Sequence, residues 1–153
     1  MRLTKSKFVT ALTCPTKLFY MANTQYANQS VDDTFLAALA EGGFQVGELA
    51  KQYFPGGINI GTLDTIKALD ETNELLKNEN VIIFEAAVKY ENCFIRVDVL
   101  EKKGNLIKIH EVKAKSFSGT QGANFLKKDG TPNSIWKKYL YDVAFQKWVC
   151  SRA

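Results

Sequence analysis

Three short runs rich in Val and Ile follow one another between residues 80 and 114, and they constrain the fold more than any other part of the chain. Their sequences are "NVIIFEAAVKY", "CFIRVDVL" and "LIKIHEVKA", and the segments "EN" and "EKKGN" separate them. Runs of this composition are typical of β-strands, and connections this short join antiparallel neighbours. The sequence therefore predicts an antiparallel meander of three strands.

Helical patterns precede this meander. Residues 5–22 predict two short helices that are broken at Pro15, because proline fits best at a helix start. Residues 32–54 begin with acids suited to a helix N-terminus and then space their apolar residues as a helix does. Within that segment Gly42 and Gly43 predict either close packing or a break between two helices.

Two further helices and one loop are expected. The first helix covers residues 62–78, begins at Thr62 and buries an apolar stripe of Leu63, Ile66, Leu69 and Leu76. The last covers residues 134–153, begins at Ser134 and has an apolar side made of Trp136, Leu140, Val143 and residues 147–150. The segment 116–134 is rich in Gly, Ser and Asn without any period, which predicts a surface loop.

Helices before and after a small sheet predict an α/β or α+β sandwich, and we expect the α/β form, with a small central mixed sheet whose faces are covered by helices. A length of 153 residues and a 46% share of apolar residues fit one domain covering residues 1–153. The last helix has no strand after it, which suggests that the domain is truncated at its C-terminus and is the N-terminal portion of a longer protein.

Charge and cysteine content narrow the function classes. The net charge of +4 suits a polyanionic partner but is also common in proteins that bind none. Polar residues interrupt the N-terminal segment, so we expect no signal peptide, no membrane partner and a cytoplasmic location. Cys14, Cys93 and Cys150 are odd in number and widely spaced, which argues against a disulfide framework and favours free thiols.

Two acids and a lysine interrupt the predicted strands. Asp98 lies inside "IRVDVL", and Glu111 and Lys113 lie at the end of "LIKIHEVK". Because side chains alternate along a strand, Glu111 and Lys113 point to one face, and a tight hairpin brings Asp98 near cross-strand register with Glu111. Two neighbouring carboxylates repel each other unless a cation lies between them, and Mg²⁺ typically takes one or two protein carboxylates, water and substrate phosphate.

This trio has two interpretations. It fits a site that cleaves phosphodiesters, in which Lys113 orients a water or stabilises charge on the phosphate in the transition state. Acids and lysines at strand ends are, however, usually solvated, and a loose pattern of this kind also arises by chance. The three residues alone leave both interpretations open.

Five segments in a fixed order make the first interpretation more specific. The segments "CPTKLFY", "GFQVGELA", "VDVL", "HEVKAKS" and "YLYDVAFQKWV" resemble the PD-(D/E)XK nuclease superfamily, and within it the RecB-like exonuclease branch that includes CRISPR-associated members. The resemblance covers residues 5–150. It implies a restriction-endonuclease-like fold and a metal-dependent DNA nuclease, with Mg²⁺ or Mn²⁺ as cofactor and DNA as partner.

The resemblance also implies roles for particular residues. The catalytic residues would be Asp98, Glu111, Lys113 and Gln146. Asp98 and Glu111 would be metal ligands, with the backbone carbonyl of Val112 as a third ligand. Lys113 would be the catalytic lysine, and Gln146 would help to place the lysine and the DNA.

The chain departs from the family pattern in its first-helix motif. Many members have a metal-binding His there, where this chain has Gly47 followed by Glu48. Whether Glu48 or Glu85 completes the metal site stays open, since each can also be a solvated carboxylate. The single histidine, His110, is expected on the strand face opposite Glu111, as a structural or surface residue rather than a ligand.

Two cysteines also bear on the resemblance. Cys150 stands where the helix motif often has Tyr, and Tyr139 could supply that ring or simply pack. In several relatives a "CP" cysteine such as Cys14 joins three C-terminal cysteines to hold an iron-sulfur cluster. Such a cluster could form here only if a longer natural chain supplied the other cysteines.

Three hypotheses follow from the sequence. The first is a DNA nuclease. In it, the DNA phosphates are contacted without sequence preference by Lys5, Lys7, Lys17 and the lysines of "LKK" and "WKK". The second is a catalytically inactive nucleic-acid-binding or scaffold domain with the same fold, because the first-helix ligand is altered. The third is a globular domain whose charged strand ends have no function. Under the first, the loop 116–134 is expected to border the cleft and to become ordered on DNA.

Overall fold

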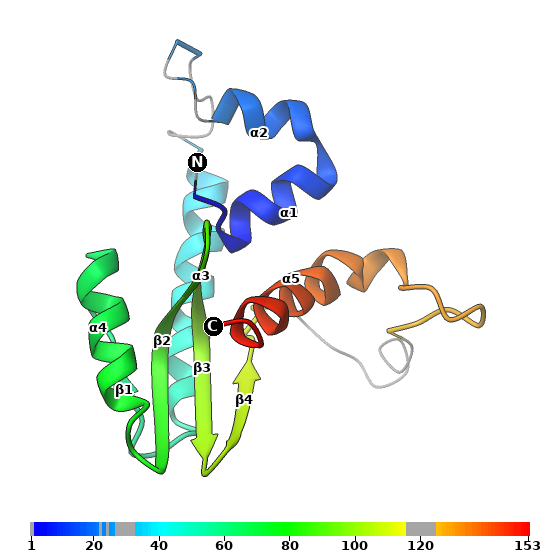
Figure 1. The fold of residues 1–153 in the computed structure, drawn as a ribbon. Coiled ribbons are helices and arrows are strands. Elements are labelled where there is room, and N and C mark those ends of the chain that lie inside the picture. Colours follow the sequence, from blue (N-terminus) through cyan, green and yellow to red (C-terminus); the bar gives the residue numbers. More distant parts are fainter. Residues whose placement is uncertain (1, 22, 24, 27–32, 116–124) are drawn as a thin grey trace.

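The computed structural model describes residues 2–21, 23, 25–26, 33–115 and 125–153, and its ribbon is shown in Figure 1. These residues form, in chain order, α1 (Lys5–Thr13), α2 (Pro15–Met21), α3 (Thr34–Lys51), β1 (Ile58–Asn59), α4 (Thr65–Leu75), β2 (Asn80–Tyr90), β3 (Cys93–Lys103), β4 (Leu106–His110) and α5 (Ser134–Cys150). The architecture is α/β, with a mixed four-stranded sheet and flanking helices.

The strands lie in the order β1-β2-β3-β4. Strands β2, β3 and β4 pair antiparallel, so the predicted meander is confirmed. Strand β1 pairs in parallel with β2, with Ile58 opposite Ile83, and makes the sheet mixed. The sequence pattern did not locate β1, because two residues inside a turn-rich connector are too few to show a period.

Both faces of the central strands are covered. Side chains alternate between the two faces along a strand, yet consecutive residues are buried together at Ile83 and Phe84 in β2 and at Val99 and Leu100 in β3. In Figure 1, α3 passes behind β2 and β3, α4 lies beside β2, and α5 lies in front of the sheet toward β4. Covered faces are what produce continuous apolar runs in place of strict alternation.

Helix α4 closes the edge of β2 beyond the short strand β1. The hydroxyl of Thr72, a fully buried residue, accepts a hydrogen bond from the backbone N–H of Ala87 at 2.9 Å and donates one to the Ala68 carbonyl at 2.7 Å. A buried N–H at a strand edge would otherwise be left without a partner. Because the helix approaches the edge so closely, its buried positions are the small residues Ala68 and Thr72.

The predicted details of α4 are partly wrong. Asp64 caps the helix, accepting from two backbone N–H groups, in place of the expected Thr62. Leu63 and Ile66, expected in the buried stripe, are 96% and 71% exposed. The other two members of that stripe are partly buried against the core. Leu63 lies before the cap, where helical spacing no longer sets its direction.

The N-terminal segment is attached to both the sheet and α5. The backbone of Leu3 accepts a hydrogen bond from the N–H of Phe94 at 2.9 Å, next to the β2–β3 turn. The ring of Phe8 stacks on Phe145 of α5 with 4.4 Å between centroids. These contacts on either side fix the position of Lys5, the first residue of α1.

The helical segments before the sheet give two different outcomes. The break at Pro15 separates α1 from α2, as expected. Helix α3 instead runs without a break through Gly42 and Gly43, and a Cβ built on either would meet no described atom within 4 Å, so the expected break or close packing is wrong. Phe35 and Leu49 of this helix are exposed. Helix α3 thus lies over an open space, not tightly against the sheet.

Helix α5 buries only part of the predicted apolar side: Val149, in the 147–150 turn, is buried, and Trp136 and Leu140 are partly buried. Asn133 caps the helix, one residue before the expected Ser134. Val143, expected on the apolar side, is 37% exposed, and the buried residues are Asp142, Phe145, Gln146 and Val149. Two of these four side chains are polar, and an apolar period cannot assign polar residues to a buried face.

The segment after β4 is described only in part. Residues 116–124, the first nine of the predicted loop, lie outside the described residues. After them, Leu126 and Pro132 form an isolated bridge around a turn in which Gly130 has a φ of +79°. A positive φ of this size favours glycine.

A search of the described helices finds no candidate membrane span, since none combines the length and the hydropathy that crossing a bilayer requires.

Candidate active site

The register of the meander brings Asp98 and Glu111 together. The last recorded pair between β3 and β4 is Val99 opposite His110, and one further step in the same register places Asp98 opposite Glu111. The backbone N–H of Val112 donates a 2.7 Å hydrogen bond to Oδ2 of Asp98. The expected cross-strand neighbourhood of the two acids is therefore confirmed, and the main chain after β4 holds Asp98 in place.

A lysine ammonium lies between the two carboxylates. The Nζ of Lys5 is 3.2 Å from Oδ1 of Asp98 and 3.0 Å from Oε2 of Glu111. The two acids therefore share one cation position, and these oxygens lie no further apart than the sum of those distances. Lys5, which was expected to contact phosphate, is half-buried and ion-paired within the site.

Glu111 has further partners from two directions. Its Oε1 accepts a hydrogen bond from Nζ of Lys113, and its Oε2 accepts one from Nε2 of Gln146 at 2.6 Å. The Glu111 side chain is only 6% exposed, so these polar contacts replace the water that a carboxylate otherwise requires. All four residues expected to be catalytic lie in one cluster, linked directly or through Lys5.

Asp142 belongs to the same cluster and was missed by the sequence analysis. Its Oδ2 lies 3.1 Å from Nζ of Lys113, and its Oδ1 accepts a 3.3 Å hydrogen bond from Nε2 of Gln146. The signal that could have located it is the spacing of four residues between Asp142 and Gln146, which places both on one side of a helix. A buried acid in this position neutralises Lys113 and orients it toward Glu111.

The two central acids have opposite pKa shifts. Burial raises the pKa of Asp98, and the charge of Glu111 adds to this, although Lys5 acts in the other direction. Burial also acts to raise the pKa of Glu111, but the charge of Lys5 and the hydrogen bonds from Lys113 and Gln146 outweigh it and lower the pKa. Glu111 is thus the acid held more firmly in its ionised form.

The lysines of the cluster are held in the charged form. Burial acts to lower the pKa of Lys5, yet the charges of Asp98 and Glu111 raise it above its usual value. The same opposition leaves the pKa of Lys113 raised, through Glu111 and Asp142. The cluster is therefore a network of charges in which cations and anions alternate.

A cleft of about 560 Å³ opens beside the cluster, between α3 and the sheet. Asp98, Glu111 and Lys113 line its sheet side, while Glu48 of α3 lines the other side. Glu48 is ion-paired with Lys51 at 2.6 Å and its side chain is 72% exposed. Val112 also lines the cleft, so the expected third ligand lies at the site, although its recorded contact is made by its N–H.

Glu85 reaches the same cleft from β2. Continuing the β2–β3 register places it opposite Asp98, between the recorded pairs of Phe84 with Val99 and Ala86 with Val97. Its φ is +57°, which is uncommon for a residue other than glycine and often marks strain at functional sites. Its Oε2 lies 3.5 Å from Nε of Arg96.

Over the described residues, no group of three or more His, Cys, Asp or Glu side chains is arranged to hold a metal ion. The site therefore offers a pair of carboxylates, not a complete protein cage.

The remaining expected residues lie elsewhere. The ring of His110 packs on Phe54 with 4.8 Å between centroids, and its Nε2 lies 3.4 Å from Glu101, outside the lining of the cleft. Tyr139 lines a smaller cavity next to the cluster. The thiol of Cys14 is half-buried and accepts a hydrogen bond from the N–H of Lys17.

Comparison of the chain with family models, with curated proteins and with solved structures found no match.

Proposed function

We propose that this protein is a divalent-metal-dependent deoxyribonuclease that hydrolyses phosphodiester bonds, of the exonuclease type. The observation that carries the proposal is the shared cation position of Asp98 and Glu111, which Lys5 Nζ occupies at 3.2 Å and 3.0 Å. Two mostly buried carboxylates that converge on one cation are suited to binding a hard divalent ion together with water and phosphate.

The donor set fits Mg²⁺ or Mn²⁺. Asp98 and Glu111 would hold the ion, and the carbonyl of Val112 would be a further oxygen ligand. Within the described part of the chain, the buried Oε1 of Gln146 has no hydrogen-bond partner, so the cluster retains an acceptor for a water or a substrate group. A bound divalent ion would supply Lewis-acid polarisation of the phosphate and a water of lowered pKa.

The residues of the chain have separate tasks in this proposal. Lys113 carries a positive charge beside Glu111 and can stabilise the charge that develops on the phosphate in the transition state. Asp142 and Gln146 keep Lys113 and Glu111 in place, through contacts of 3.1 Å and 2.6 Å. Asp, Glu-x-Lys and a helix Gln follow one another here in the order typical of the RecB-like nuclease branch that the sequence resembles. This resemblance supports a restriction-endonuclease-like fold and DNA as the substrate.

A second candidate is an inactive nucleic-acid-binding domain with the same fold. The observation that favours it is the same contact, since the Lys5 ammonium already lies between the two acids and pairs with each. For a metal to bind, Lys5 must move away or shift toward the phosphate. A protein in which the Lys5 ammonium always stays between the two acids would keep its basic surface and have no cleavage activity.

Calorimetric titration of Mn²⁺ into the protein and into Asp98→Asn separates the two candidates. The nuclease proposal expects one site in the wild type, strongly weakened binding in Asp98→Asn, and cleavage of single-stranded DNA only with the metal. Asp70→Asn is the matched control, because Asp70 is an exposed acid on α4 and should leave binding unchanged. Equal weak binding by all three proteins, with no cleavage, would leave the inactive domain as the function.

A further inference from the structure

Two further cavities lie beyond the cleft, along α1 and α5. The first, of about 350 Å³, shares Lys5 and Lys113 with the cleft and is also lined by Lys138 and Tyr139. The second, of about 630 Å³, shares Val9 and Lys138 with the first. Because each cavity shares lining residues with the next, the three lie next to one another in a row, here called the groove, that starts at the acidic pair.

The charge of the groove changes along its length. The cleft contains four acids among its described lining residues, whereas among those of the first cavity the only acid is Asp142, which pairs with Lys113. The described lining of the second cavity has no acid and three lysines: Lys115, Lys137 and Lys138. The groove is therefore suited to an anionic ligand that extends away from the metal-binding end.

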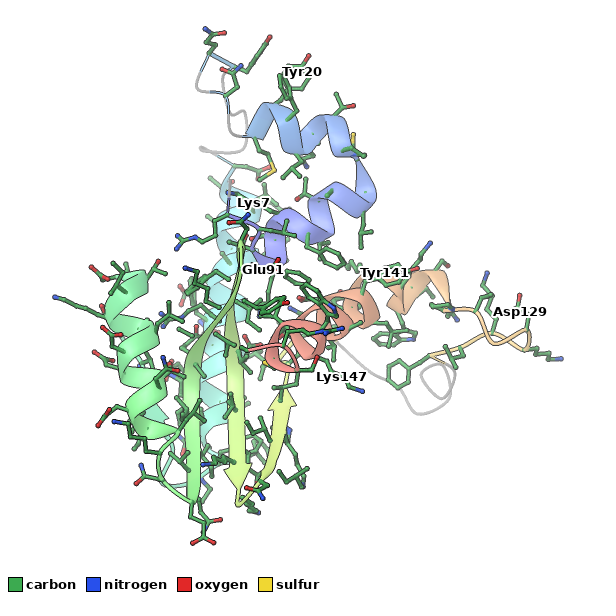
Figure 2. The ribbon with its side chains drawn as sticks, in the orientation of Figure 1. Lys7, Tyr20, Glu91, Asp129, Tyr141 and Lys147 are labelled. Carbon is green, nitrogen blue, oxygen red and sulfur yellow. The ribbon has the colours of Figure 1, made fainter. Side chains whose placement is uncertain are left out.

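Aromatic rings alternate with these lysines. The Nζ of Lys115 lies 5.0 Å from the ring centroid of Trp136 and 5.5 Å from that of Tyr139. On α5, Nζ of Lys138 lies 4.8 Å from the ring centroid of Tyr139, and Nζ of Lys137 lies 5.6 Å from that of Tyr141. Tyr141 is labelled in Figure 2, on α5 where that helix passes α1.

We infer that this groove, along the first half of α5 and the facing side of α1, binds single-stranded polynucleotide and leads it into the cleft. The lysines contact phosphates, and the rings of Tyr139 and Tyr141 stack on unpaired bases. Interleaved cations and aromatic rings are how proteins bind single strands without sequence preference, because every base has a face on which a ring can stack. The inference rests on the proposed function for its direction, since the phosphate to be cleaved lies at the acidic end.

Binding of a fluorescent oligothymidylate, measured by anisotropy with a chelator present, tests the groove without requiring cleavage. The test variant is Lys137→Gln with Lys138→Gln. The matched control is Lys67→Gln with Lys89→Gln, two exposed lysines on α4 and β2 that line none of the three cavities. Each phosphate contact to a single strand contributes about 0.7 to the slope of log affinity against log salt, so the test variant should lose roughly 1.4 of that slope. The control should lose none.

A second variant tests stacking. Tyr141→Ala should weaken oligothymidylate binding by roughly tenfold, the scale of one lost stacked base, with an unchanged salt slope. A hairpin duplex of the same length should bind the wild type more weakly than the single strand and should be insensitive to Tyr141→Ala. Equal loss in the lysine control, or stronger binding of duplex than of single strand, would overturn the inference.

The two proposals can fail separately. If the lysine variant loses single-strand binding while the wild type binds no Mn²⁺, the result supports single-strand binding by the groove and contradicts the nuclease proposal. If the wild type cleaves DNA while the lysine and tyrosine variants bind as tightly as the wild type, the result supports the nuclease proposal and contradicts single-strand binding by the groove.

Discussion

The ammonium group of Lys5 lies 3.0 Å from Oε2 of Glu111, although the two residues are 106 positions apart in the chain. The same group contacts Asp98, so Lys5 holds together two acids that would otherwise repel each other. A divalent ion at the acidic pair and the Lys5 ammonium would occupy the same place. The first prediction follows from this competition.

Lys5→Met should lower the stability of the metal-free protein and increase the stabilisation that added Mn²⁺ provides. Removing one partner of a buried ion pair costs about 3–5 kcal/mol, and because these groups are roughly a quarter exposed we expect about 1–3 kcal/mol. Thermal unfolding with chelator and with Mn²⁺ measures both effects. Lys17→Met, at an exposed lysine of α2, is the control. An identical Mn²⁺ shift in wild type and Lys5→Met would show that the ammonium does not compete with metal.

Lys113→Ala should lower the cleavage rate at saturating DNA by roughly 10² to 10³, the scale of losing one positioned electrostatic donor. DNA affinity should change little, because other lysines contact the backbone. Single-turnover cleavage and anisotropy on the same preparation separate the two quantities. Lost affinity with a retained rate per complex would make Lys113 a phosphate contact only.

Glu111→Gln should have a different signature from Lys113→Ala. A neutral amide is a poor ligand for a hard cation, so both metal binding and cleavage should be lost. Calorimetry with Mn²⁺ checks the first, and the cleavage assay checks the second. Retained metal binding in this variant would remove Glu111 from the ligand set.

Gln146→Glu should destabilise the protein increasingly as the pH rises. The new carboxylate would be buried beside Glu111 and Asp142, so its pKa would lie above that of an ordinary Glu and the folded state would bind the extra proton. Stability relative to wild type is then lost as the pH rises above the unfolded-state pKa, by about 3 kcal/mol at pH 8. Urea unfolding at pH 5 and pH 8 measures this, with Gln52→Glu as an exposed control. A pH-independent difference would contradict the buried contact.

At position 85, glycine should give a more stable protein than alanine, which is the reverse of the usual order in a strand. The φ of +57° at Glu85 suits glycine, so Glu85→Gly should be more stable than Glu85→Ala by about 1 kcal/mol. Lys89, an exposed residue of the same strand without a positive φ, is the control, and there glycine should be the less stable of the two. Chemical unfolding of the four variants gives both differences. The same order at both sites would show that Glu85 is not strained.

The meander and most helices could be predicted from the sequence, because each depends on neighbours along the chain. Apolar runs with short turn-forming connections predict β2, β3 and β4, and Pro15 ends one helix and begins the next. The same local information brings Asp98 close to Glu111, since a hairpin fixes register over a few residues. The carboxylate pair at the centre of the site is thus a property of one local segment.

Only the tertiary structure decided which partners that pair has. Lys5 reaches the acid pair because the backbone of Leu3 is hydrogen-bonded to Phe94 of β3 and the ring of Phe8 is stacked on α5. Both are contacts between segments far apart in the chain. Asp142 and Gln146 are buried because α5 turns its polar positions toward Glu111, which no apolar period indicates. Strand β1 and the Thr72 contact likewise depend on a neighbour, β2, that follows them in the sequence. Local patterns record which residues can form strands and helices, whereas the pairing of buried charges depends on how those elements pack.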